Sequence, residues 1–194
     1  MKLRATLMLF AAFCFLLTVP AWSQDICQTW AGNQIVNCGF ETGDFTGWGQ
    51  YGDLSFTFVN GNPYSGSHAA WFGEVNGTGD IYQYVGAPGE TLYWVHFELA
   101  NLSGGDNFMT VYWNGQDVGP DLFNAPAFGY TLFSGVLIGN PCAGCNEFDM
   151  QFYQPPSYWN LDSVFVGSPE PGTLMLFGSG VLGLAGLFRR KINL

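Results

Sequence analysis

The stretch ETLYWVHFELA, residues 90–100, alternates in a way that predicts a β-strand. Its apolar set is Tyr93, Val95 and Phe97, and the set between them mixes Trp94 with polar side chains. Successive side chains of a strand point to opposite faces, so one face of this segment suits a core and the other suits a surface. The pattern favours a strand of a sheet that is buried on one side only.

Similar short runs of aromatic and β-branched residues recur between turns of Gly, Asn and Pro, and no long helical period interrupts them. The further runs are residues 34–37, 54–59, 68–75, 80–85, 108–115, 130–138, 147–154 and 161–167. Asn114-Gly115 is a hairpin signal. Together the runs predict about nine strands in an all-β sandwich.

The N-terminus has the three parts of a secretory signal peptide. Lys2 and Arg4 precede an apolar run over residues 5–19, and small residues follow up to Ser23. This order predicts that signal peptidase removes residues 1–23, so the protein is exported. An uncleaved membrane anchor is the alternative, but the apolar run is short and a good cleavage site follows it.

The C-terminus contains a second apolar run, residues 173–188, which carries no charge. Its 16 residues are close to the minimum for a transmembrane helix. A buried core helix would need a polar face toward solvent, and this run has none. The basic tail, residues 189–194, is expected to stay in the cytoplasm, which places the domain outside and anchors it to the inner membrane.

A tripeptide, Pro169-Glu170-Pro171, lies in the linker of residues 168–172, directly before the apolar run. The order of export signal, domain, Pro-Glu-Pro, apolar span and basic cluster resembles the PEP-CTERM sorting signal of bacteria with two membranes. The matching basic residues are Arg189, Arg190 and Lys191. The resemblance implies that an exosortase recognises the tail, cuts near Pro-Glu-Pro and delivers the domain to the cell surface or medium, where such proteins accompany exopolysaccharide.

The predicted domain, residues 24–167, has no Lys or Arg, because all five lie at positions 2, 4, 189, 190 and 191. Of the 15 acids only Glu170 lies outside the domain, so its net charge is 0 − 14 = −14. Nucleic acid is excluded as a partner, since binding it requires cations that neutralise phosphates. Anionic polysaccharides and lipid headgroups are poor partners for the same reason. Clustered carboxylates would need protons, water or a cation such as calcium.

Four cysteines remain after signal cleavage: Cys27, Cys38, Cys142 and Cys145. Four cysteines in an exported protein favour two disulfides. Three pairings are possible and the sequence does not choose among them, although the local solution is Cys27–Cys38 with Cys142–Cys145. A four-thiolate zinc site is a weaker alternative, because the spacing between Cys27 and Cys38 does not fit one. A thioredoxin-like redox role for CAGC is also weaker, because no strand–helix context surrounds this motif.

Three motifs resemble those of galactose-binding-like domains, a group that includes many carbohydrate-binding modules. They are NCGFETGDFTGW at 37–48, NPYSGSHAAWFG at 62–73 and YWNLDSVFV at 158–166. The resemblance covers nearly all of residues 35–166 and implies a jelly-roll fold. It also implies a structural calcium held by Glu41, by Asp162 and by backbone carbonyls near Ser65 and Gly66. Alternatively, Glu41 caps its turn and Asp162 binds nearby backbone amides.

Sugar binding requires exposed rings that stack on pyranose faces, together with polar groups that reach hydroxyls. Among the many aromatic residues, we expect Trp94 and Tyr112 on strand faces, and Tyr64 and Tyr158 in loops, to contact sugar. The negative domain favours a neutral extracellular polysaccharide as the ligand.

Catalysis is not expected. The domain has only His68 and His96 and shows no nucleophile elbow or metal-hydrolase motif. The sequence therefore predicts an exported, non-catalytic surface or matrix protein that binds neutral glycan. The alternatives are a purely structural surface protein without a sugar site and a small glycan-active enzyme, which would need two carboxylates converging in a pocket.

Overall fold

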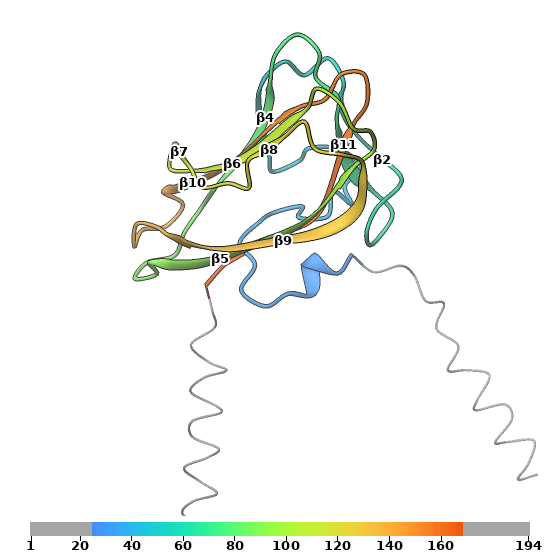
Figure 1. The fold of residues 1–194 in the computed structure, drawn as a ribbon. Coiled ribbons are helices and arrows are strands. Elements are labelled where there is room, and N and C mark those ends of the chain that lie inside the picture. Colours follow the sequence, from blue (N-terminus) through green and yellow to red (C-terminus); the bar gives the residue numbers. More distant parts are fainter. Residues whose placement is uncertain (1–24, 169–194) are drawn as a thin grey trace, which may run out of the picture.

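The computed structural model describes residues 25–168, which form two packed β-sheets (Figure 1). The signal peptide, the Pro-Glu-Pro motif, the apolar span and the basic tail predicted above lie outside these residues. Sheet A contains, in spatial order, β1 (Gly49–Gly52), β4 (Gly79–Val85), β10 (Asn146–Tyr153), β6 (Phe108–Trp113) and β7 (Gln116–Asp117), with β8 (Leu122–Phe123) also paired to β6. Sheet B contains β2 (Thr57–Asn60), β3 (Ala69–Phe72), β11 (Trp159–Gly167), β5 (Leu92–Asn101) and β9 (Phe128–Ile138).

The core lies between the two sheets and follows the alternation seen in the sequence. Tyr93 and Phe97 on β5 are buried, as predicted. Across the sandwich, Phe72 of sheet B stacks on Phe152 of sheet A with ring centroids 3.9 Å apart. Because stacked aromatic pairs bury large areas, this contact helps to hold the two sheets together.

The prediction of a jelly-roll β-sandwich is confirmed, although the number of strands differs. The described residues hold eleven strands, of which β7 and β8 have two residues each. The sequence prediction missed β1, whose GQYG sequence lacks β-branched residues. The strand expected at 34–37 is wrong: this segment enters a turn, and Asn37 has a φ of 52°.

The hairpin signal at Asn114-Gly115 is confirmed. Trp113 pairs with Gln116, so these two residues alone connect β6 to β7. Both have positive φ, 52° for Asn114 and 73° for Gly115, which is the geometry that a tight type I′ hairpin needs.

Two disulfides join the local pairs, Cys27–Cys38 and Cys142–Cys145. The first ties the short 3-10 helix η1 (Cys27–Thr29) to the turn that opens the fold. The two ends of the described chain both lie on the side of sheet B (Figure 1). Within residues 25–168, no helix has the length and hydropathy needed to cross a bilayer.

Candidate functional site

The outer face of sheet A carries four tyrosines on three strands. Tyr51 comes from β1, Tyr82 and Tyr84 from β4, and Tyr112 from β6; we call these four residues the tyrosine face. The tyrosines of β4 and β6 point outward because neighbours such as Ile81 and Val111 face the core. Tyr51 lies on the same face because it pairs with Asp80, two residues before Tyr82 on β4.

The register of sheet A brings these rings together. Asp149 of β10 pairs with Tyr82 on one side and with Tyr112 on the other. The Tyr82 ring lies 5.9 Å from that of Tyr51 and 5.8 Å from that of Tyr84, centroid to centroid. A Cβ at Gly49 would collide with the Tyr82 ring, so the glycine lets this ring lie across β1.

Carboxylates lie among the tyrosines and have unpaired oxygens. Asp80 is 2% exposed and Asp149 is 4% exposed, and one oxygen of each has no hydrogen-bond partner. Tyr51 Oη donates to Asp149 Oδ2 at 2.7 Å, and Gln151 Nε2 donates to Asp80 Oδ2 at 3.3 Å. Burial, followed by the negative charge of Asp149, raises the pKa of Asp80 to about 6. Burial also raises the pKa of Asp149.

This face can hold a flat, hydroxyl-bearing ligand. Tyr84 is 58% exposed and Tyr51 is 48% exposed, so their rings offer free surface for stacking. Glu147 and Gln151, on the outward side of β10, offer polar groups beside the rings. Because rings and hydrogen-bonding groups alternate over adjacent strands, a sugar could contact both at once.

The four residues predicted to bind sugar do not form one site. Tyr112 lies on the tyrosine face, whereas Trp94 and Tyr64 line a groove on the outer face of sheet B, together with Glu98. Tyr158 packs edge-on against Trp71, with ring centroids 5.4 Å apart. Tyr51, Tyr82 and Tyr84 were not predicted from the sequence, although DIYQY at 80–84 alternates in the required way.

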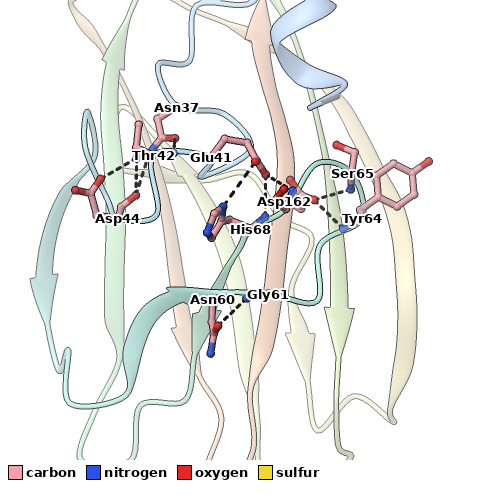
Figure 2. Close-up of polar contacts among 11 residues, drawn as sticks. Asn37, Glu41, Thr42, Asp44, Asn60, Gly61, Tyr64, Ser65, His68 and Asp162 are labelled. Atoms are coloured by element: carbon pink, nitrogen blue, oxygen red, sulfur yellow. Dashed lines mark hydrogen bonds and ion pairs between the residues drawn. The ribbon is translucent and has the colours of Figure 1, made fainter. Parts of the chain in front are cut away.

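The residues predicted to bind calcium meet at one turn, residues 64–68 (Figure 2). Glu41 Oε1 accepts the backbone N–H groups of Ser67 at 2.7 Å and His68 at 2.8 Å, and Glu41 Oε2 lies 3.6 Å from His68 Nδ1. Gly66 has a φ of +72°, and a Cβ there would collide with the Glu41 carboxylate. The turn therefore needs glycine at this position.

Asp162 binds the same turn from β11 (Figure 2). Its Oδ2 accepts the N–H groups of Tyr64 at 2.7 Å and Ser65 at 2.9 Å, and its Oδ1 accepts that of Ser163 at 2.5 Å. Ser163 has a φ of 53° at the register shift between β11 and β5. Burial raises the pKa of Asp162 to about 7, although these hydrogen bonds oppose the rise.

Asp25 is a third acid near this turn, and it was not predicted from the sequence. Its Oδ1 accepts the N–H of Cys27 at 3.1 Å, and its buried Oδ2 has no partner. Burial raises its pKa, and the charge of Glu41 adds to the rise. Asp25 stands alone two residues after the predicted cleavage site, so no sequence pattern indicates that it lies beside the 64–68 turn.

These acids do not form a calcium cage in this arrangement. Glu41 accepts two backbone N–H groups and Asp162 accepts three, and N–H groups repel a cation. Calcium requires six to eight oxygen ligands. Among residues 25–168, the one group of three possible ligand atoms within 4.8 Å of one another is Asp25 with Cys27 and Cys38, whose sulfurs form a disulfide. The calcium site remains a prediction from the resemblance.

Chelation tests this geometry. We expect the melting temperature of the protein to differ by less than roughly 1 °C between excess EDTA and millimolar calcium, because a ligand stabilises only a state that binds it. Differential scanning calorimetry gives this comparison, with magnesium as the control cation. A calcium-specific rise of several degrees would show that the folded domain binds calcium, which the hydrogen-bonded arrangement of Glu41 and Asp162 does not predict.

Comparison with known proteins identifies the end of the chain. Residues 169–191 match the family described as the PEP-CTERM protein-sorting motif. The chain carries a PEP-CTERM sorting signal. This signal implies export and processing of a membrane-anchored C-terminus, which agrees with the tripartite order seen in the sequence. No curated protein matches the chain.

Solved structures share the fold of the domain. TmCBM61, solved in complex with beta-1,4-galactotriose, is 20% identical with a TM-score of 0.50, over 71% of this chain and 99% of that one. The family 16 carbohydrate binding module-2 is 17% identical with a TM-score of 0.51, over 70% of this chain and 100% of that one. The K3 cleaved adhesin domain of Lys-gingipain from Porphyromonas gingivalis W83 is 13% identical with a TM-score of 0.50, over 72% and 100% of the two chains. The domain thus has the jelly-roll fold of carbohydrate-binding modules.

Proposed function

We propose that this chain is an exported, non-catalytic surface protein whose jelly-roll domain binds a neutral glycan on the tyrosine face of sheet A. An exosortase would act on the PEP-CTERM signal and pass the domain to the cell surface or the medium. The observation that carries the glycan proposal is the gathering of Tyr51, Tyr82, Tyr84 and Tyr112 around Asp149 on adjacent strands.

The chemistry of this face suits sugar. Tyrosine rings stack on the apolar faces of pyranose rings at small entropic cost, because the strands hold them in place. The unpaired oxygens of Asp80 and Asp149 are acceptors, and sugar hydroxyls are donors. Buried acceptors without a partner are costly, so a ligand that supplies hydroxyl donors after a small movement of the rings relieves this cost.

The charge of the domain restricts the ligand. The 14 acids of residues 24–167 have no Lys or Arg to offset them, so uronic acids and sulfated sugars are repelled. A neutral polysaccharide is therefore the class that fits best. TmCBM61, which shares this fold, was solved in complex with beta-1,4-galactotriose. Our proposal extends this kind of ligand to the present chain.

The burial of the two acids on the tyrosine face supports binding without catalysis. A glycosidase needs two carboxyl groups that reach opposite sides of a glycosidic bond. Asp80 and Asp149 are almost fully covered, and Tyr51 Oη is hydrogen-bonded to Asp149. Neither acid stands free to protonate a leaving group.

Substitution of the tyrosines tests the proposal. We expect Tyr82→Ala and Tyr112→Ala each to weaken binding to beta-1,4-galactotriose, or to the best ligand on an array of neutral oligosaccharides, by about fivefold or more, because one stacked ring contributes on the order of 1 kcal/mol or more. Isothermal titration calorimetry measures the affinity, and near-UV circular dichroism checks the fold.

Trp94→Ala is the matched control, because Trp94 is an exposed ring on the opposite sheet. Its affinity should equal that of the unaltered protein. Loss of binding in Trp94→Ala with no loss in Tyr82→Ala would move the site to the groove of sheet B. Absence of binding to every neutral glycan would favour a purely structural surface protein.

A further inference from the structure

An apolar row lies on the outer face of sheet B, at the end where β5 begins and β9 ends. Four residues form this surface, which we call the apolar row: Leu92 and Trp94 on β5, and Val136 and Ile138 on β9. Trp94 is 53% exposed, Val136 is 60% exposed and Ile138 is 79% exposed. Neighbouring apolar side chains with this exposure mark a surface that contacts a protein, a ligand or a membrane.

The register shows that the row is one continuous surface. Leu92 pairs with Ile138, and Trp94 pairs with Val136. These side chains share the outer side of the sheet, because the residues between them, Tyr93 and Leu137, are buried in the core.

The polypeptide leaves the domain at this row. Gly167, the last residue of β11, pairs with Trp94. The PEP-CTERM match begins at residue 169, and only the linker of residues 168–172 separates the strand end from the apolar span expected at 173–188. A tether this short holds the row close to the membrane surface and gives it a high effective concentration there.

The charge of the row agrees with a lipid surface. The eleven residues of β9 carry no charged side chain, although the domain as a whole has a charge of −14. The nearest acid in sequence, Glu90, is hydrogen-bonded to Ser168 Oγ at 2.7 Å and to Gln34 Nε2 at 2.9 Å. Tryptophan, moreover, is enriched, with tyrosine, at the boundary between lipid tails and headgroups.

We propose that the apolar row docks the domain on the lipid bilayer beside its own C-terminal anchor, before the sorting signal is processed. Docking holds the 168–171 segment at the membrane surface, where a membrane enzyme reaches it. It also turns sheet A away from the bilayer, because sheet A forms the opposite layer of the sandwich (Figure 1).

Quenching by brominated lipid tests the proposal. The full chain is reconstituted in phosphatidylcholine vesicles that contain phosphatidylcholine brominated near the headgroup end of its acyl chains. We expect the tryptophan fluorescence to be quenched, and Trp94→Phe to lose most of the quenching. A second variant, Val136→Asp, keeps Trp94 but places a charge beside it, and it should also reduce quenching while its near-UV circular dichroism stays unchanged.

Trp71→Phe is the control, because Trp71 lies on the outer face of the same sheet but on β3, where its ring stacks on Phe58. Its quenching should equal that of the unaltered chain. Equal quenching in Trp94→Phe and Trp71→Phe would overturn the proposal. So would self-association that depends on protein concentration without any quenching, because the row would then contact a second copy of the chain.

Discussion

We expect the domain to become more stable as the pH falls from about 8 to about 5, whereas the maximum stability of most proteins lies within that range. The expected gain is roughly 3 kcal/mol, or about 5–10 °C in melting temperature for a domain of this size. The cause is a set of buried carboxyl groups without a cationic partner, since residues 24–167 contain no Lys or Arg.

Three acids carry most of this effect. Burial raises the pKa of Glu74 from 4.5 to about 7, that of Asp162 from 3.8 to about 7 and that of Asp80 from 3.8 to about 6. An acid whose pKa is higher in the folded state binds its proton more tightly there. Its contribution to stability is complete below the unfolded pKa and is lost as the pH rises through the folded value. The window therefore runs from about pH 4 to about pH 7.

Two further terms bear on the size of the gain. Burial lowers the pKa of His96, so protonation of this residue favours the unfolded state and opposes the gain below its usual pKa of 6.5. Hydrogen bonds lower the pKa of Asp53 to about 2, and this acid affects stability only at pH values below the window. One opposing histidine does not cancel three acids that act together.

Thermal unfolding at constant ionic strength measures the effect, with circular dichroism recorded at half-unit steps of pH. Glu74→Gln is the informative control. Thr57 Oγ1 donates to Glu74, and the amide oxygen of glutamine can accept the same bond without a charge. This variant should be more stable than the unaltered protein near pH 8 and should show a flatter profile. A melting temperature that falls steadily from pH 8 to pH 5 would contradict the assigned pKa directions.

The fold was predictable because local pattern and global architecture agree. The alternation of residues 90–100 located β5, and Asn114-Gly115 located a hairpin, since each signal depends on a few adjacent residues. The structure of the segments at 34–37 and 49–52 could not be predicted from their sequence. Their backbone is set by distant partners: Gln34 N–H donates to Val166 O, and Gly49 pairs with Tyr82.

The candidate site was only partly predictable, because register decides which residues meet. Tyr82 and Tyr112 lie 30 positions apart in the sequence, yet both pair with Asp149. Trp94 and Tyr112 each alternate with core residues in the same manner, although they lie on opposite faces of the sandwich. Alternation predicts that a side chain is exposed, and only strand order shows which surface it joins.

The two proposed surfaces are compatible in space. The tyrosine face belongs to sheet A, and the apolar row belongs to sheet B beside the chain exit at Gly167. A domain held on the membrane by sheet B thus keeps sheet A turned away from the bilayer, so the tyrosine face stays free of lipid until the domain is released. The acids around the tyrosine face would favour this orientation as well, since an anionic lipid surface repels them.

We expect Asp162→Ala to be the most damaging single substitution of a polar residue in the domain, with a loss of about 3–5 kcal/mol. The carboxylate accepts the N–H groups of Tyr64, Ser65 and Ser163. Alanine leaves these three donors without their acceptor at a position that is 0% exposed in the folded protein. Each buried donor left unpaired costs about 1–3 kcal/mol.

Asp162→Asn separates hydrogen bonding from charge. One amide oxygen can still accept from Tyr64 and Ser65, but the amide NH₂ then faces the N–H of Ser163, so we expect an intermediate loss. Asp106→Ala is the control, since Asp106 is an exposed acid in the 104–107 turn, and it should change stability by less than about 0.5 kcal/mol.

Urea unfolding of the three variants near pH 7 gives the free energies of unfolding, and a second series near pH 5 ties this result to the pH profile. Asp162→Ala should also lose the part of the acid-induced gain that Asp162 supplies, because it has no carboxyl group to protonate. Stability equal to that of the unaltered protein would mean that the 64–68 turn is held by other contacts. A loss that is seen only in calcium-containing buffer would instead show that Asp162 binds calcium in solution, because a cation that binds the folded state alone adds to its stability.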